Sequence, residues 1–195
     1  MNLNLNFNLK SKKLFSTVAA LALITSNIFS VPASAQEIQR SSSSSSAVPN
    51  ANAGSFYISM SADSTGKTAA AYNKAPLNTA YKNTNTWFDV TTNFRYVPQL
   101  AGTYLITGQC GAITGTLGET TQAAIYLNGV QFSAGYYQTQ STVVGGFVES
   151  ITSTMITVNG TTDFIELYCY LPAAVTTLSG GNRYRTFMMG YYVAS

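Results

Sequence analysis

Short segments in which apolar and polar residues alternate fill the second half of the chain. Tyr104, Ile106, Gly108 and Cys110 occupy every second position of one segment, and apolar residues alternate with Ser and Thr through 147–158. Because neighbouring side chains on a β-strand point to opposite faces, this period of two predicts strands. The other predicted strands are Phe56–Met60, Trp87–Val90, Phe94–Val97, Thr121–Leu127, Val130–Phe132, Phe164–Leu171 and Arg183–Val193.

Turn-forming residues separate these segments. Asn128-Gly129 is a pair favoured in two-residue type I′ hairpins, and the glycine-containing segment 111–118 is expected to be a loop. A long loop is also expected over 62–86, where Asn, Thr, Ala and Lys predominate. No segment has a helical period. The pattern therefore predicts an all-β domain, a sandwich or barrel of about eight to ten short strands.

The first 35 residues have the organisation of a secretory signal peptide. Lysines precede the mostly apolar segment 14–24, and the small residues that a signal peptidase requires follow at 33–35. Cleavage is therefore expected between Ala35 and Gln36. A retained membrane anchor is the alternative, but the apolar segment is shorter than the roughly 20 residues of a membrane span. Secretion is the expected fate, to the cell surface, the medium or a periplasm.

Composition divides the remainder of the chain into two parts. Residues 36–54 contain the run Ser41–Ser46 and few apolar side chains, which predicts a disordered, Ser-rich linker. The alternative is a specific function for this segment, as a surface tether or a site of O-linked modification. Residues 55–195 are long enough to form one domain with a single core.

Removal of the predicted signal peptide changes the charge of the protein. Three of the ten Lys and Arg residues lie in that peptide and none of the seven acids does, so the full-chain charge of +3 becomes zero. A neutral surface with so few charges offers no electrostatic basis for binding nucleic acid or anionic lipid. Low net charge also weakens repulsion between copies, which favours association.

The composition argues against catalysis. The chain has no His, which removes the commonest general base and every Ser-His arrangement. With only two Cys as well, a zinc site or a thiolate nucleophile is not expected. Asp163 is expected in a turn and Glu166 on an outer strand face, so a glycosidase-like carboxylate pair is not favoured. We expect no enzyme activity, no catalytic residue, no cofactor and no metal site.

Aromatic residues gather in the C-terminal half. Phe164, Tyr168 and Tyr170 share the strand face opposite the expected core, and Tyr191 lies in the last strand. Aromatic side chains are enriched at the centres of protein interfaces, so these four are the expected subunit-interface residues. A carbohydrate-stacking platform or an ordinary solvated face are the alternatives. Arg183 and Arg185 alternate onto one face of the predicted last strand, where a solvated edge is favoured over an anion site.

Four sequence elements occur in an order that resembles the C1q/TNF-like jelly-roll domain, in its bacterial and phage form. The resemblance covers 56–193 and is strongest from Phe94 onward. The matching residues are Phe94, Pro98, Gly102 and Tyr104 of F-x-x-x-P-x-x-x-G-x-Y, Tyr126, Asn128 and Gly129 of the hairpin, Gly160–Leu167 with one residue inserted, and Phe187, Gly190 and Tyr191 of the closing strand.

The resemblance implies a jelly-roll β-sandwich of about ten antiparallel strands that forms a homotrimer and uses its loops for recognition. In this topology, the strands of Cys110 and Cys169 lie in opposite sheets, so the two cysteines could form a disulfide across the sandwich; two reduced core cysteines are the alternative. No Gly-X-Y collagen repeat precedes the domain, and the acidic calcium ligands of some relatives have no match here.

The sequence therefore predicts a secreted, non-enzymatic binding and assembly module with a protein or glycan ligand. We expect no nucleic-acid partner and no membrane insertion of the mature chain. One alternative is a structural subunit of a surface filament or extracellular matrix, in which 36–54 would pair with a sheet edge of the next subunit. Another is a glycan-binding or glycan-cleaving domain on the same sandwich.

Overall fold

The computed structural model describes residues 54–114, 117–139 and 146–195. These residues belong to one compact unit. The predicted signal peptide, its cleavage position between Ala35 and Gln36, and the predicted linker up to residue 53 lie outside the described residues. Within the described part of the chain, no helix is long and apolar enough to cross a membrane.

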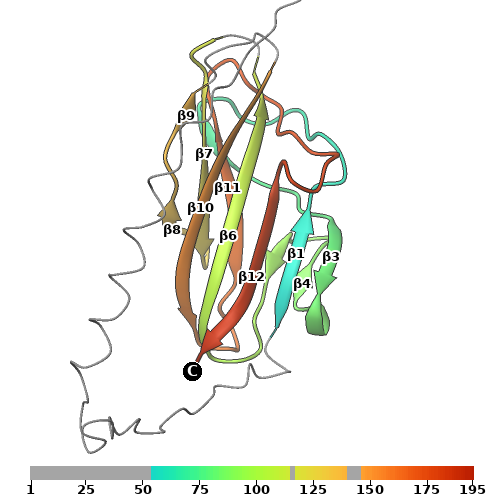
Figure 1. Ribbon diagram of the computed structural model, residues 1–195, viewed down its shortest axis with the longest axis vertical. Helices are drawn as coiled ribbons and strands as arrows, with labels where there is room; N and C mark the ends of the chain where they lie inside the picture. Colours follow the sequence, from blue (N-terminus) through green and yellow to red (C-terminus); the bar gives the residue numbers. More distant parts are fainter. Residues whose placement is uncertain (1–53, 115–116, 140–145) are drawn as a thin grey trace, which may run out of the picture. The chain divides into compact units, whose positions relative to one another are not determined.

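Two antiparallel sheets form the domain, as the all-β prediction requires (Figure 1). The five-stranded sheet has the order β10 (Phe147–Val158), β6 (Gly102–Ile113), β12 (Phe187–Ala194), β1 (Ser55–Ser59) and β3 (Thr79–Asn83). The seven-stranded sheet has the order β4 (Phe88–Asp89), β5 (Arg95–Tyr96), β11 (Ile165–Leu171), β7 (Thr120–Leu127) and β8 (Val130–Ala134), with β2 (Ala71–Lys74) also pairing with β11 and β9 (Gln138–Thr139) with β7.

The core lies between the two sheets. Tyr104 and Ile106 of β6 point inward and are fully buried, as are Ile125 of β7 and Leu167 of β11. Gly108 of β6 has no side chain because the opposite sheet comes close: a Cβ there would lie 2.6 Å from Leu167 Cδ1 and 2.8 Å from Ile125 Cδ1. The buried face of β6 is therefore the one predicted from the alternation of its residues.

A disulfide joins the two sheets through the core. Cys110 of β6 is bonded to Cys169 of β11, with the two Cα atoms 5.5 Å apart. Neither cysteine is exposed to solvent. The predicted pairing is confirmed, and it covalently fixes the distance between the sheets at this point.

The β7–β8 hairpin also forms as predicted. Asn128 and Gly129 have φ angles of 54° and 79°, the left-handed values that a type I′ turn needs. The Asn128 side chain accepts a hydrogen bond from the backbone N–H of Phe164 and donates one to Asp163, at 2.9 and 2.8 Å. Asp163 thus lies in a turn, as expected.

Three predicted boundaries are wrong. The expected loop over 62–86 contains two strands, β2 and β3, whose half-exposed, largely polar side chains give no apolar period. Strand β6 continues through Ile113 into the expected glycine loop. Strand β12 begins only at Phe187. Arg183 and Arg185 lie in the turn before it, closed by the bond from Arg185 N–H to Asn182 O, and not on a strand face.

Candidate functional site

The outer face of the five-stranded sheet exposes large apolar side chains. Its strands alternate inward and outward residues, and the outward positions of β10 and β12 carry apolar groups that a solvated face would not need. Met155 is 60% exposed, Ile151 55% and Tyr191 54%. The exposed large apolar residues of these two strands are Phe147, Ile151, Met155, Met189, Tyr191 and Val193.

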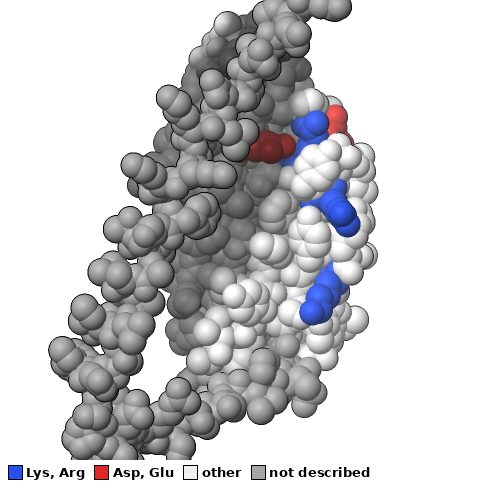
Figure 2. All heavy atoms as spheres, in the orientation of Figure 1, with Lys and Arg blue, Asp and Glu red and all other residues white. Residues whose placement is uncertain are grey.

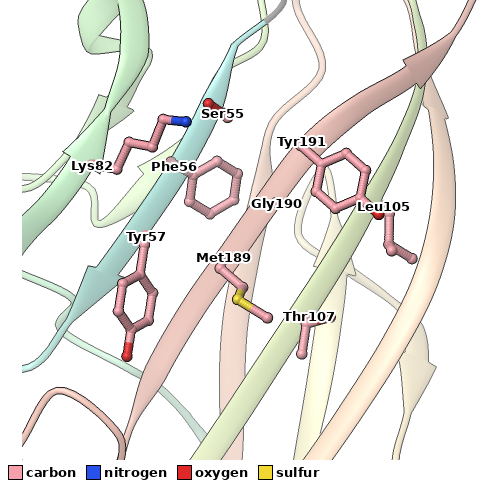
Figure 3. A pocket seen from close by; sticks show the side chains of 9 residues that line it. All are labelled: Ser55, Phe56, Tyr57, Lys82, Leu105, Thr107, Met189, Gly190 and Tyr191. Carbon is pink, nitrogen blue, oxygen red and sulfur yellow. The ribbon is translucent and has the colours of Figure 1, made fainter. Parts of the chain in front are cut away.

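A hollow of about 600 Å³ lies on this face (Figure 3). Tyr57 of β1, with Met189 and Tyr191 of β12, extends beside it, and Leu105 and Thr107 of β6 complete the lining on one side. Lys82 of β3 and Ser55 lie on the other side, and the backbone at Phe56 and Gly190 passes between the rows of side chains. Tyr57, Leu105, Met189 and Tyr191 thus give a largely apolar lining to a depression of the size that proteins use for ligands or for side chains of a partner.

Gly190 keeps the strand beneath this hollow close to the core. A Cβ at this position would lie 2.6 Å from Ile106 Cδ1 and 2.9 Å from Phe56 Cε1. The neighbouring Tyr57 is fixed by its hydroxyl, which donates a 2.6 Å hydrogen bond to the Arg183 carbonyl. Partial burial raises the pKa of Tyr57 above its ordinary value, so the ring remains neutral at physiological pH.

Charged side chains are sparse on this face. Among the described outward positions of β6, β10 and β12, Glu149 is the one charged residue, and it accepts a 3.3 Å hydrogen bond from Gln109. The Arg185 guanidinium lies 3.2 Å from the centre of the Phe147 ring at the end of the face. Figure 2 shows the Lys and Arg side chains in view gathered on the side where β1 and β3 lie. Apart from Glu149, the outward positions of β6, β10 and β12 are therefore uncharged.

Tyrosine rings cover the outer face of the seven-stranded sheet. The rings of Tyr126 and Tyr168 stack with centroids 4.0 Å apart, and Tyr72 contacts Tyr126 and Tyr170 edge-on. Tyr137 packs edge-on against Tyr170 at 5.5 Å. Burial raises the pKa of Tyr72 to about 12, so its hydroxyl, which donates a hydrogen bond to Gln122, stays protonated well above neutral pH. These rings therefore pack mainly against one another.

The expected interface residues do not share one face. Tyr168 and Tyr170 lie on the outer face of the seven-stranded sheet, and Phe164 precedes β11 with the Arg95 guanidinium 4.5 Å from its ring centre. Tyr191 lies on the opposite, five-stranded sheet, beside the hollow. The shared outer placement of Tyr168 and Tyr170 was predicted correctly. Ile151, Met155 and Met189 were not among the predicted interface residues, although the apolar residues at 147, 151 and 155 were a signal for a second apolar face on β10.

Several of the acidic side chains have structural partners. Glu166 lies on the outer side of β11, as expected, but it is buried there and forms an ion pair with Lys74 of β2. Asp89, Asp163 and Asp63 each accept backbone hydrogen bonds within loops or turns. In the described part of the chain, no group of three or more His, Cys, Asp or Glu residues could hold a metal ion.

Comparison with known proteins gives similarity of fold. No protein-family model matches the chain, and no curated protein sequence matches it. Murine APRIL, crystallised at pH 5.0, aligns with a TM-score of 0.51 at 10% identity, over 72% of this chain and 99% of APRIL. The globular domain of zebrafish complement 1qA (TM-score 0.46, 10% identity, 72% and 97% coverage) and Eiger TNF from S. frugiperda (0.49, 13%, 73% and 92%) are further similar structures. The fold is that of C1q/TNF-like jelly-roll domains.

Proposed function

We propose that this protein is a secreted, non-enzymatic assembly and binding module whose copies form a homotrimer through the outer face of the five-stranded sheet. The observation that carries the proposal is the apolar, nearly uncharged surface of β10 and β12, with Ile151, Met155 and Tyr191 each more than half exposed. Monomeric proteins seldom leave such a surface in water. Trimer formation is the mode of association that the resemblance to C1q/TNF-like domains implies.

Two further features support this proposal. The inter-sheet disulfide fits an oxidising compartment, in agreement with the signal peptide predicted before Gln36. The mature chain has no net charge, so copies approach one another without electrostatic repulsion. Once copies associate through the five-stranded sheet, the loops and the tyrosine-covered outer face of the seven-stranded sheet stay available for a protein or glycan ligand.

The first test measures the mass of the exported protein in solution. The full chain is expressed in a bacterial host, and the exported form is analysed by light scattering on a sizing column over a range of dilutions. A particle of three chains is expected, each chain beginning at Gln36 by mass spectrometry. A monomer at all concentrations contradicts the proposal, and polymers that grow with concentration favour the filament alternative.

A matched pair of substitutions locates the interface. Ile151→Glu places a carboxylate on the exposed apolar side of β10, where burial in an interface without a partner costs several kcal/mol. We expect the trimer to dissociate at concentrations at least 10-fold higher than for the unsubstituted protein, with an unchanged circular dichroism spectrum. Val130→Glu is the control, because Val130 is 70% exposed on β8 of the other sheet. Equal effects of the two substitutions would rule out the five-stranded face.

A further inference from the structure

The hollow on the five-stranded sheet occupies two cross-strand rows of residues. In one row, Leu105 of β6 is paired with Tyr191 of β12, which is paired with Ser55 of β1. In the next row, Thr107, Met189, Tyr57 and Lys82 follow one another across β6, β12, β1 and β3. These outward residues make up the hollow's side-chain lining, so its position along the strands is fixed by the register of the sheet.

Strand β10 continues the same two rows beyond the hollow. Met155 is paired with Leu105, and Ser153 with Thr107. The Ser153 hydroxyl is held against the sheet by a 2.7 Å hydrogen bond with Thr107, whereas Met155 is 60% exposed. The face therefore has a protruding side chain at one edge and a hollow toward the other, both at the same position along the strands.

This arrangement suits a contact between two different parts of the face. A rotation about an axis parallel to the strands moves β10 of one copy toward a neighbour without changing the position of its residues along the strands. Such a head-to-tail contact closes into a ring when the rotation divides a full turn. A two-fold contact of one patch with itself would instead place Met155 against Met155, and hollow against hollow.

We propose, resting on the assembly proposed above, that Met155 of each copy inserts into the hollow between Tyr57 and Tyr191 of the next copy around a three-fold axis. The charges on the two surfaces are compatible with this contact. The outward residues of β10 from Ile151 to Thr157 are uncharged, and the one charge lining the hollow belongs to Lys82, which is itself exposed. The flexible thioether chains of Met155 and Met189 can adapt to each other as the hollow fills.

Cysteine cross-linking tests this contact in the exported protein. Met155→Cys and Tyr191→Cys place thiols in the same row, and the native cysteines do not interfere because they are bonded to each other and buried. The double variant and both single variants are first sized by light scattering, then oxidised mildly and separated on a non-reducing denaturing gel. The control pair is Met155→Cys with Phe132→Cys, because Phe132 lies on β8 of the other sheet.

The contact predicts bands of two and three linked chains from the double variant, in at least 10-fold greater yield than from either single variant or the control pair. Linked dimers from Met155→Cys alone would overturn it in favour of a two-fold contact. Bands beyond three chains would overturn the closed ring. A normal trimer mass without cross-links would overturn the insertion of Met155 while leaving the proposed trimer intact, and a monomeric unsubstituted protein would overturn both.

A second cysteine pair keeps the contact testable if the first substitutions themselves prevent assembly. If the sizing step shows that Met155→Cys or Tyr191→Cys dissociates the trimer, Ser153→Cys with Met189→Cys reports on the adjoining row. This pair should give the same three-chain limit. Failure of both pairs to cross-link in an assembled trimer contradicts the proposed contact.

Discussion

Asp89 fixes the turn between β4 and β5 with its carboxylate. One oxygen accepts hydrogen bonds from the backbone N–H groups of Thr91 and Thr92 at 2.9 and 3.0 Å, and the other accepts two from Asn93. The N–H groups of Thr92 and Thr91 favour the charged carboxylate and hold the pKa of Asp89 well below its usual range. The turn therefore depends on the charge state of a single side chain.

Asp89→Ala should lower the free energy of unfolding by about 1 kcal/mol at neutral pH, because several turn hydrogen bonds are lost. The folded pKa is depressed, so this contribution is present above the unfolded value of about 3.9 and is lost as the pH falls toward the folded value. Urea unfolding of both proteins at pH 7, 4 and 2 should therefore show a difference that narrows in acid. A difference that stays constant over this range would contradict the role of the carboxylate, and Glu149→Ala serves as the control.

Strands β2 and β11 are joined by an ion pair as well as by backbone pairing. Glu166 has a side chain only 5% exposed, and its partner Lys74 is 29% exposed. The Glu166 carboxylate is thus removed from water and depends on one lysine, while that lysine remains partly solvated. A buried charge that loses its partner is more costly than a pair replaced by apolar groups.

Lys74→Met should therefore destabilise the domain by about 2 kcal/mol, because it leaves Glu166 buried without a countercharge. The double variant Lys74→Met/Glu166→Leu should recover at least half of that loss. Urea unfolding at pH 7 measures both changes. If the double variant is less stable than Lys74→Met, the ion pair contributes more than the desolvation of its members costs.

The strands differ in how far their sequences predict them. Strands β1, β7, β10 and β11 bury one face in the core, so their apolar periods mark them within a residue or two. Strand β2 has no such period, because backbone pairing with β11 and the Lys74 ion pair stabilise it instead. The last strand was predicted to begin at Arg183, four residues before the actual start of β12. The reason is that Arg183-Tyr184-Arg185 alternates like a strand, although these residues form a turn.

The candidate site was less predictable because alternation alone does not say which side of a strand faces the core. On β10 the inward side includes Ser150 and Thr152, and the Ser150 hydroxyl accepts a hydrogen bond from Ala123 N–H of β7. Polar residues therefore occupy inward positions, while Ile151 and Met155 face outward. Only the pairing of β10 with β6 and the contacts between the sheets decide this orientation.

For the whole molecule, the Cys110–Cys169 disulfide is the strongest single constraint. It closes a loop with a sequence separation of 59 residues, and a cross-link of this span stabilises a fold by about 4 kcal/mol through the entropy of the unfolded chain. Cys110→Ala/Cys169→Ala should lower the free energy of unfolding by a comparable amount in a urea titration. The removed sulfur atoms would also leave space in the core, which adds to the loss.

The burial of both cysteines gives this experiment a control that needs no substitution. A reductant without denaturant should leave the unsubstituted protein with no thiols that react with a labelling reagent, because the bond is inaccessible in the folded state. The same reductant in urea should give two thiols per chain that react with the reagent. Rapid labelling of the folded protein would contradict the buried position of the bond.

The disulfide has a further consequence if the module is pulled from its N-terminal side, as a surface tether would do. Strand β1, which lies between β12 and β3, takes the load first. The chain between Cys110 and Cys169 is bypassed by the bond and cannot lengthen, so about 200 Å of potential extension is withheld from the stretched polypeptide. Tension can detach the strands near the termini, while β7 to β10 and the first part of β11 stay inside a loop that the disulfide keeps closed.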